Sequence, residues 1–199
     1  EHKFGVRQKE QIRSLKNGVN VISLSATPIP RTLNLSLSKV RDISLITTPP
    51  TGRKSVKTIV SRYSKSLVFE AIQREFYRDG QVFYLLNNVS MLEEKKKEIS
   101  DRFPGKKIAF AHGQLRPKEL SKVMESFIRK EIDLLVCTTI IESGIDIENA
   151  NTLIVEESEN YGLSQLHQIR GRVGRSKREA YAYFFPVSYT HLRAHETNS

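Results

Sequence analysis

Cysteine is nearly absent from this chain, which has a single one, Cys137, among its 199 residues. One thiol excludes an internal disulfide and is typical of proteins from a reducing compartment such as the cytoplasm. Cys137 ends the apolar run DLLVC at residues 133–137. We therefore expect a buried structural thiol there rather than a nucleophile.

Long apolar runs are missing as well, so no membrane span and no signal peptide is visible. Hydrophobic residues still make up 38% of the chain, which is enough for a globular core. Acidic residues are the minority charge, since 32 Lys and Arg outnumber 22 Asp and Glu and leave a net charge of +10. This excess favours a polyanionic partner, nucleic acid before membrane, although a merely soluble basic protein fits it too.

Strand-like and helix-like segments alternate along most of the chain. Strands that alternate with amphipathic helices predict a parallel α/β sheet. Pro117 opens one of these helices at a position where its missing N–H costs nothing. The apolar spacing of that helix predicts five core residues: Leu120, Val123, Met124, Phe127 and Ile128. Strands are expected at residues 19–24, 42–47, 55–63, 81–86, 107–111, 132–137, 152–156 and 180–185, and helices at 65–78, 91–103 and from 117 onward.

The segment QLHQIRGRVGRS, residues 165–176, has two contrasting faces on a helical wheel. An apolar arc contains Leu163, Leu166, Ile169 and Val173, and a polar arc contains Gln165, Gln168, Arg172 and Arg175. Gly171 and Gly174 stand beside the arginines, where a missing Cβ allows close approach. Arginine binds phosphate well because its planar fork stays charged and donates several hydrogen bonds. We interpret the polar arc as an anion site; the alternative is a solvated basic helix end.

Polar residues also follow several predicted strands, where ligands of open parallel sheets bind. Hydroxyls, amides and backbone N–H groups at one sheet edge can follow a phosphodiester backbone without reading its sequence. Each cluster alone is equally typical of turns and helix caps. The clusters contain Ser25 and Thr27, then Asn87, then His112 and Gly113, and finally Thr138, Thr139, Gly144 and Asp146.

Four segments resemble motifs of the superfamily 2 helicases in their usual order. SATPIPRT, HGQL, TTIIESGIDI and QLHQIRGRVGRS are similar to motifs III, IVa, V and VI, and the resemblance covers residues 1–186. Within that superfamily the chain most resembles the double-stranded DNA translocases that couple transcription to repair. Fork-reversal helicases, which share PIPRT and the RGRVGR segment, are the near alternative.

The resemblance implies a RecA-like parallel sheet flanked by helices, the C-terminal domain of a helicase motor. We expect residues 1–48 to be the last part of a first RecA-like domain and residues 49–186 to form the second. Residues 187–199 lack apolar periodicity and are expected to be a tail foreign to the domain. His191 and His195 in that tail lie four apart, but two histidines without a third ligand make a poor metal site.

Roles for individual residues follow from the resemblance alone. Arg172 and Arg175 would be arginine fingers on the γ-phosphate of ATP held between two RecA-like domains, and Gln168 would sense that phosphate. Gly144 and Asp146 would lie at the nucleotide edge. Ser25, Thr27 and His2 would couple nucleotide state to domain closure. The DNA strand would be contacted by Asn87, His112, Gly113, Thr138 and Thr139.

The chain also departs from the family pattern. It has no G-x-x-x-x-G-K-[ST] phosphate loop, and Glu1-His2 resembles only the end of a D-E-x-H box. We therefore expect a fragment without ATPase activity of its own, from a cytoplasmic protein that uses ATP and Mg²⁺ held mainly by the first domain. The implied partners are double-stranded DNA and, through other domains, RNA polymerase and nucleotide-excision repair proteins, with no membrane. A non-catalytic nucleic-acid-binding module is the alternative of a different class.

Overall fold

The computed structural model describes residues 54–138 and 147–187. The chain divides into two units, Glu1–Ile46 and Thr47–Ser199, and every described residue belongs to the second. The strands predicted at 19–24 and 42–47 and the tail beyond Val187 lie outside the described residues. No helix of the described ranges is long and apolar enough to cross a membrane.

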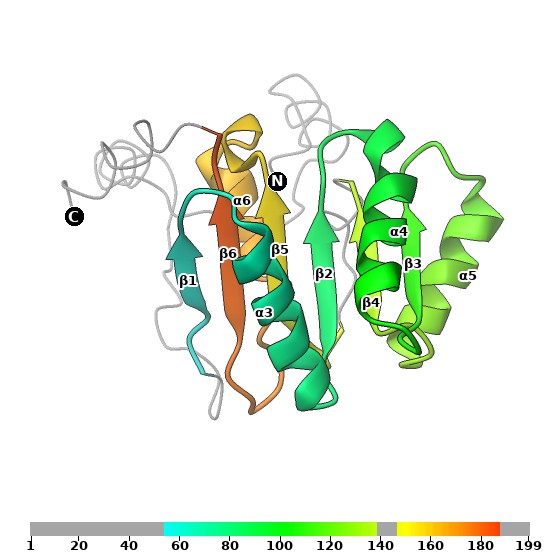
Figure 1. Cartoon of the computed structure of the whole chain (residues 1–199), viewed down its shortest axis with the longest axis horizontal. Coiled ribbons are helices and arrows are strands. Elements are labelled where there is room, and N and C mark those ends of the chain that lie inside the picture. Colours follow the sequence, from blue (N-terminus) through cyan, green and yellow to red (C-terminus); the bar gives the residue numbers. More distant parts are fainter. Residues whose placement is uncertain (1–53, 139–146, 188–199) are drawn as a thin grey trace, which may run out of the picture. The chain divides into compact units, whose positions relative to one another are not determined.

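The described residues contain one sheet of six strands, and every pairing in it is parallel. The strand order is β1-β6-β5-β2-β4-β3 (Figure 1). All six were predicted, with boundaries shifted by a few residues. Their bounds are β1 (Lys57–Val60), β2 (Gln81–Leu85), β3 (Ile108–Ala111), β4 (Leu134–Cys137), β5 (Ala150–Glu156) and β6 (Tyr181–Phe185).

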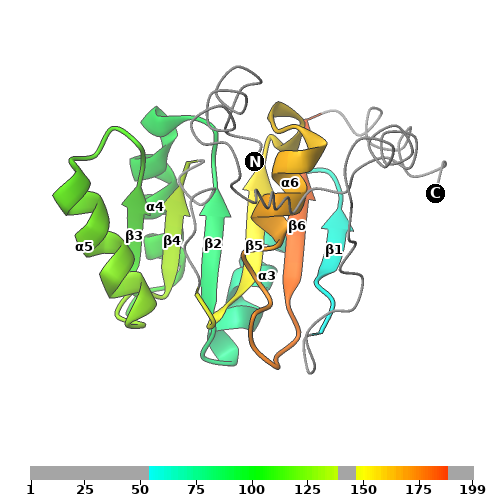
Figure 2. The same cartoon turned by 180° about the vertical axis from the view of Figure 1, so that it is seen from behind.

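Four α-helices cover the two faces of this sheet. Helices α3 (Lys65–Tyr77) and α4 (Leu92–Arg102) lie on the face toward the viewer in Figure 1. Helices α5 (Pro117–Ile128) and α6 (Leu163–Arg170) lie on the opposite face, which Figure 2 turns forward. Two short 3-10 helices, η1 (Val89–Met91) and η3 (Ser158–Asn160), complete the described elements. The arrangement is a three-layered α/β fold with a parallel sheet flanked by helices, as predicted.

Alternate residues of the central strands feed two separate cores. In β2, Val82 and Tyr84 join the cluster beneath α3 and α4, while Phe83 and Leu85 join the cluster beneath α5 and α6. All five residues of β2 are buried. A parallel strand covered on both faces buries consecutive residues, which explains its uninterrupted apolar sequence.

The predicted core face of α5 is largely confirmed. Met124 and Phe127 are buried. Leu120 and Val123 are partly buried and pack against the same cluster. Ile128 is an exception, because its side chain is 50% exposed. It is the last residue of the helix and lies at the rim of the apolar arc, ~80° from Leu120 at 100° per residue.

Cys137 is fully enclosed at the end of β4, as the sequence predicted. Burial raises the pKa of its thiol, because a charged thiolate would lose its hydration there. A thiol that stays protonated and inaccessible is a packing group.

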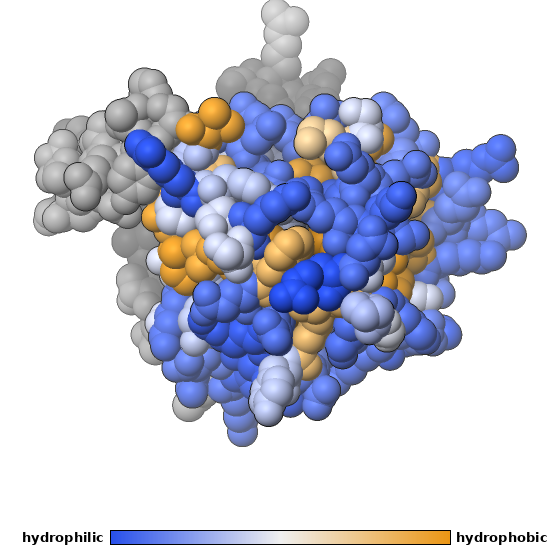
Figure 3. Space-filling view, in the orientation of Figure 1, coloured by the Kyte–Doolittle hydropathy of each residue, from blue (hydrophilic) through white to orange (hydrophobic). Residues whose placement is uncertain are grey.

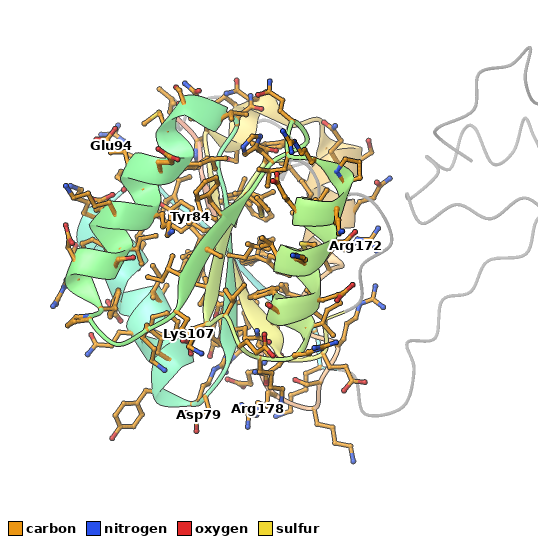
Figure 4. The ribbon with its side chains drawn as sticks, turned by 90° about the vertical axis from the view of Figure 1, so that its right-hand side faces the viewer. Asp79, Tyr84, Glu94, Lys107, Arg172 and Arg178 are labelled. Carbon is orange, nitrogen blue, oxygen red and sulfur yellow. The ribbon has the colours of Figure 1, made fainter. Side chains whose placement is uncertain are left out.

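A group of partly buried charges joins α4 to the carboxyl end of the sheet. The Lys95 ammonium lies 3.0 Å from Glu156 of β5 and 2.9 Å from Glu98 of its own helix. Burial acts to lower the pKa of Lys95, but the hydrogen bond to Glu98 and the charge of Glu156 outweigh it, so that the pKa is raised. Tyr84 donates its hydroxyl to Glu156, and burial followed by the Glu156 charge raises the pKa of that phenol. Figure 4 shows Tyr84 between the sheet and the helices of this face.

The outer surface of this face is mostly hydrophilic, with smaller hydrophobic areas between the polar side chains (Figure 3). Helix α4 contributes much of the charge, since Glu93, Glu94 and Lys97 are exposed while Leu92 and Ile99 are fully buried. The helix is therefore amphipathic, as its sequence predicted.

A second buried carboxylate, that of Glu75, joins the end of α3 to β5. Its Oε2 accepts hydrogen bonds from the Thr152 hydroxyl at 2.6 Å and from Arg78 Nε at 3.0 Å. Its other oxygen lies against Gly80, where a Cβ would come within 1.6 Å of Oε1 and 2.5 Å of Cδ. Gly80 is therefore the residue that leaves space for this carboxylate.

Replacing Gly80 by alanine should displace the Glu75 carboxylate and cost about 2 kcal/mol or more of unfolding free energy. The cost combines overpacking with the loss of hydrogen bonds to a buried charge. Chemical denaturation of the two proteins measures it. Gly113→Ala is the matched control and should be nearly neutral, because a Cβ there meets nothing within 4 Å. Equal stability of the two variants would contradict this description of Gly80.

Candidate functional site

Helix α6 ends before the end of the helix predicted over residues 165–176. Its last residue is Arg170, and Gly171 caps it with N–H bonds to the His167 and Ile169 carbonyls. Arg172 and Arg175 therefore do not share a helical face with Gln168, and that prediction is wrong. Leu163, placed in the apolar arc, is the first residue of the helix and is 60% exposed. The other three residues of that arc, Leu166, Ile169 and Val173, are buried as predicted.

Gly174 adopts a left-handed backbone conformation after the end of α6. Its φ of +73° lies in the left-handed region, which L-residues with a Cβ avoid. A Cβ at Gly174 would come within 2.8 Å of the Ala180 Cβ and 3.0 Å of Val56 Cγ2. The Gly174 N–H also donates to the carbonyl of Ala150, the first residue of β5, at 3.4 Å. The chain at Gly174 is thus held against the amino ends of the strands, the close approach that the sequence predicted for this glycine.

Residues 171–180, which we call the arginine loop, are braced by two further hydrogen bonds. The Ser176 hydroxyl donates to Asn151 Oδ1 at 2.7 Å, and the Arg178 guanidinium donates to the Arg78 carbonyl at 2.6 Å. In Figure 4 Arg178 lies beside Asp79 at the amino end of the sheet, and Arg172 lies on the side that carries α5. The loop is anchored to β5 and to the end of α3.

Arg172 is half-buried and Arg175 is exposed. Gln168, in the last turns of α6, is also half-buried. The two arginines are three residues apart in a loop fixed on both sides, so their main-chain positions are defined. Two guanidiniums on a braced loop form a donor set suited to a phosphate, because each presents a planar fork of N–H groups.

Arg170 is a residue that the sequence reasoning missed. Its guanidinium lies 3.0 Å from His167 Nδ1 and 3.4 Å from the Thr58 hydroxyl. Arginine can only donate, so Nδ1 accepts and the imidazole proton sits on Nε2. Burial, followed by the charge of Arg170, lowers the pKa of His167. Arg170 therefore connects α6 to the edge strand β1 and is not part of the polar arc.

The predicted polar cluster at the carboxyl end of the sheet is partly brought together. Asn87, Thr138 and His112 follow β2, β4 and β3, which are neighbouring strands. The Thr138 N–H donates to the Ala111 carbonyl at 3.3 Å, beside His112. Asn87 and Gly113 are exposed, whereas Thr138 is only 9% exposed.

The arginine loop reaches the amino end of the sheet, because Gly174 contacts residues that precede strands, whereas the polar cluster follows strands. Arg172 itself lies farther from that end than Arg178 does, on the side that carries α5 (Figure 4). Six predicted site residues lie outside the described ranges: His2, Ser25, Thr27, Thr139, Gly144 and Asp146. Within residues 54–138 and 147–187, no group of three or more His, Cys, Asp or Glu could hold a metal ion.

Residues 65–177 match the family model of the helicase conserved C-terminal domain. The chain belongs to this family, and the matched range includes both loop arginines. The sequence is 54% identical over 184 residues to the transcription-repair-coupling factor of Staphylococcus aureus (strain USA300), which covers 92% of this chain. The chain spans 16% of the length of that protein.

Solved structures show the same architecture. The structure of RecG bound to a three-way DNA junction has a TM-score of 0.67 and 38% identity, covering 81% of this chain and 22% of that one. Saccharomyces cerevisiae Dbp5 bound to RNA and ADP BeF3 has a TM-score of 0.65 at 16% identity, covering 94% of this chain and 51% of that one. The Dbp5 similarity is evidence for the fold alone.

His167 should titrate below its ordinary pKa of about 6.5, and Arg170→Gln should move that pKa upward. A histidine whose pKa is lowered in the folded protein binds a proton more readily in the unfolded chain. The free energy of unfolding therefore falls as the pH drops below about 6.5. Following the imidazole resonances by NMR during a pH titration measures the value, with His167→Gln to assign them. An unchanged pKa in Arg170→Gln would contradict the role given to the guanidinium.

Proposed function

We propose that this chain is the second motor domain of an ATP-dependent double-stranded DNA translocase of the transcription-repair-coupling factor type. The observation that carries the proposal is the braced arginine loop, which holds Arg172 and Arg175 at fixed main-chain positions. The 54% identity to the S. aureus coupling factor over most of the chain supports the assignment to this type.

In the proposed mechanism, Arg172 and Arg175 donate to the γ-phosphate oxygens of ATP when two motor domains close. Charge on the transferred phosphoryl group is spread over its oxygens, and guanidiniums placed beside it lower the barrier to hydrolysis. Gln168 contributes an amide to the same phosphate. The arginine loop needs no rearrangement in this step because Gly174 and Ser176 already hold it.

ATP supplies the γ-phosphate, and the proposal assigns both ATP and Mg²⁺ mainly to another motor domain. This division is supported by the sequence, which has no G-x-x-x-x-G-K-[ST] phosphate loop. Gly144 and Asp146 would complete the nucleotide edge, and His2, Ser25 and Thr27 would couple it to closure. The isolated chain would then bind ATP weakly and would not hydrolyse it.

The proposal assigns DNA to the carboxyl end of the sheet. Asn87 comes after β2, and His112 and Gly113 come after β3. In sequence Thr138 and Thr139 follow β4, which lies between those two strands in the sheet. Amides, hydroxyls and backbone N–H groups suit phosphate contacts that do not depend on base sequence.

RNA polymerase and nucleotide-excision repair proteins are the proposed partners of the whole protein, which would act in the cytoplasm. A RecG-type helicase is the second candidate, favoured by the 38% identity to the RecG structure. The higher identity of 54% to the coupling factor is the reason for our order of preference. Displacement of a stalled polymerase would support the first candidate, and selective action on branched DNA would support the second.

In the full-length protein that contains this segment, Arg172→Ala and Arg175→Ala should each reduce DNA-stimulated ATP turnover by about a hundredfold or more. Removing a transition-state donor of this kind typically costs that much or more. ATP binding should change little, because most of the site lies elsewhere. Steady-state hydrolysis and binding of a fluorescent ATP analogue measure the two effects.

Lys177→Ala is the matched control, since it removes an exposed positive charge from the same loop. Its turnover should stay close to that of the unmodified protein. Retained turnover in both arginine variants would refute the proposed function.

A further inference from the structure

Strand β5 contains one residue more than its partner at its amino end. Gln81 of β2 pairs with Ala150, but the next residue, Val82, pairs with Thr152. Asn151 is therefore a bulge residue with no partner in β2. Bulges commonly re-aim a side chain beside a functional site.

The packing of the two flanking residues agrees with this bulge. Ala150 belongs to the core beneath α5 and α6, whereas Thr152 bonds to Glu75 of α3 on the other face. In a regular strand, residues two apart share a face. The extra residue thus reverses the alternation between the two faces of the sheet at this point.

Asn151 is fully buried, and both ends of its amide are occupied. Nδ2 donates to the Asn149 carbonyl at 3.0 Å, and Oδ1 accepts from the Ser176 hydroxyl at 2.7 Å. The Ser176 oxygen in turn accepts the Arg178 N–H at 3.2 Å. The Asn149 carbonyl can only accept and the Arg178 N–H can only donate, so the direction of every bond between them is defined. These bonds hold Ser176 against β5.

Ser176 directly follows Arg175 in the arginine loop. We propose that Asn151 is a positioning residue for Arg175 and Arg172, acting through the Ser176 hydroxyl. The bulge directs the amide toward the loop, and the buried hydrogen bond holds the loop in place. This inference rests on the proposed function, because positioning matters only if the arginines act on a phosphate.

The expected effect is a loss of catalytic rate without a loss of nucleotide affinity. Catalytic groups must be held within a fraction of an ångström, and a shift of about 1 Å can cost a hundredfold in rate. A loop that is loosened but still present would bind ground-state nucleotide almost normally. Arginines that reach the phosphate less often would lower turnover.

The test uses the full-length protein containing this segment and the variants Ser176→Ala, Ser176→Thr and Asn151→Ala. Ser176→Ala and Asn151→Ala should lower the DNA-stimulated kcat tenfold or more while the KM for ATP stays within about twofold. Ser176→Thr keeps the hydroxyl and should retain most of the kcat. Ser176 is only half-buried, so its alanine variant remains interpretable if Asn151→Ala folds poorly.

Ile99→Val is the control for stability, because it removes a fully buried methyl group from α4 without touching the arginine loop. It should lower the melting temperature and leave kcat unchanged. A normal kcat in Ser176→Ala, or an equal loss of kcat in Ile99→Val, would overturn the positioning role. Normal turnover in Arg172→Ala and Arg175→Ala would instead overturn the proposed function, so the two failures are distinguishable.

Discussion

The inner strands of the sheet are buried on both faces, and this constraint places polar chemistry at the two ends of the strands. Strands β2, β4 and β5 have nearly every residue buried, so an unpaired polar side chain in their middle would lose its hydration. At the amino end, Ser176 and Arg178 of the arginine loop bond to Asn151 and Arg78, and at the carboxyl end lies the cluster around Asn87 and His112. The two ends of the strands thus carry different polar groups.

Three buried polar side chains of the described residues join one element to another. Glu75 connects the end of α3 to Thr152, and Lys95 connects α4 to Glu156 at the opposite end of the same strand. Asn151 connects β5 to the arginine loop. Strand β5 is therefore bonded through its side chains to both helices of one face and to the loop. A side chain that binds phosphate is positioned more precisely when its loop is bonded to a rigid strand such as β5.

The sequence was sufficient to predict the elements whose apolar periodicity is strong. The spacing in α5 and the uninterrupted apolar runs of β2 and β4 predicted their type and their core residues, with Ile128 as the exception at a helix end. The arginine segment was predicted less well, because its apolar periodicity continues through Val173 although the helix ends at Arg170. The close packing of Gly174 involves Val56 and Ala150, and the bulge at Asn151 involves the pairing of β5 with β2. Those contacts are distant in sequence, so no local pattern could have revealed them.

The central claim is that the arginine loop reaches the γ-phosphate of an ATP held mainly by another domain. A structure of the full-length protein with ADP and beryllium fluoride, which stands in for that phosphate, tests it most directly. We expect a guanidinium nitrogen of Arg172 or Arg175 at hydrogen-bond distance, about 3 Å, from a fluoride. A closed nucleotide site with both guanidiniums more than roughly 6 Å away, beyond direct contact, would contradict it.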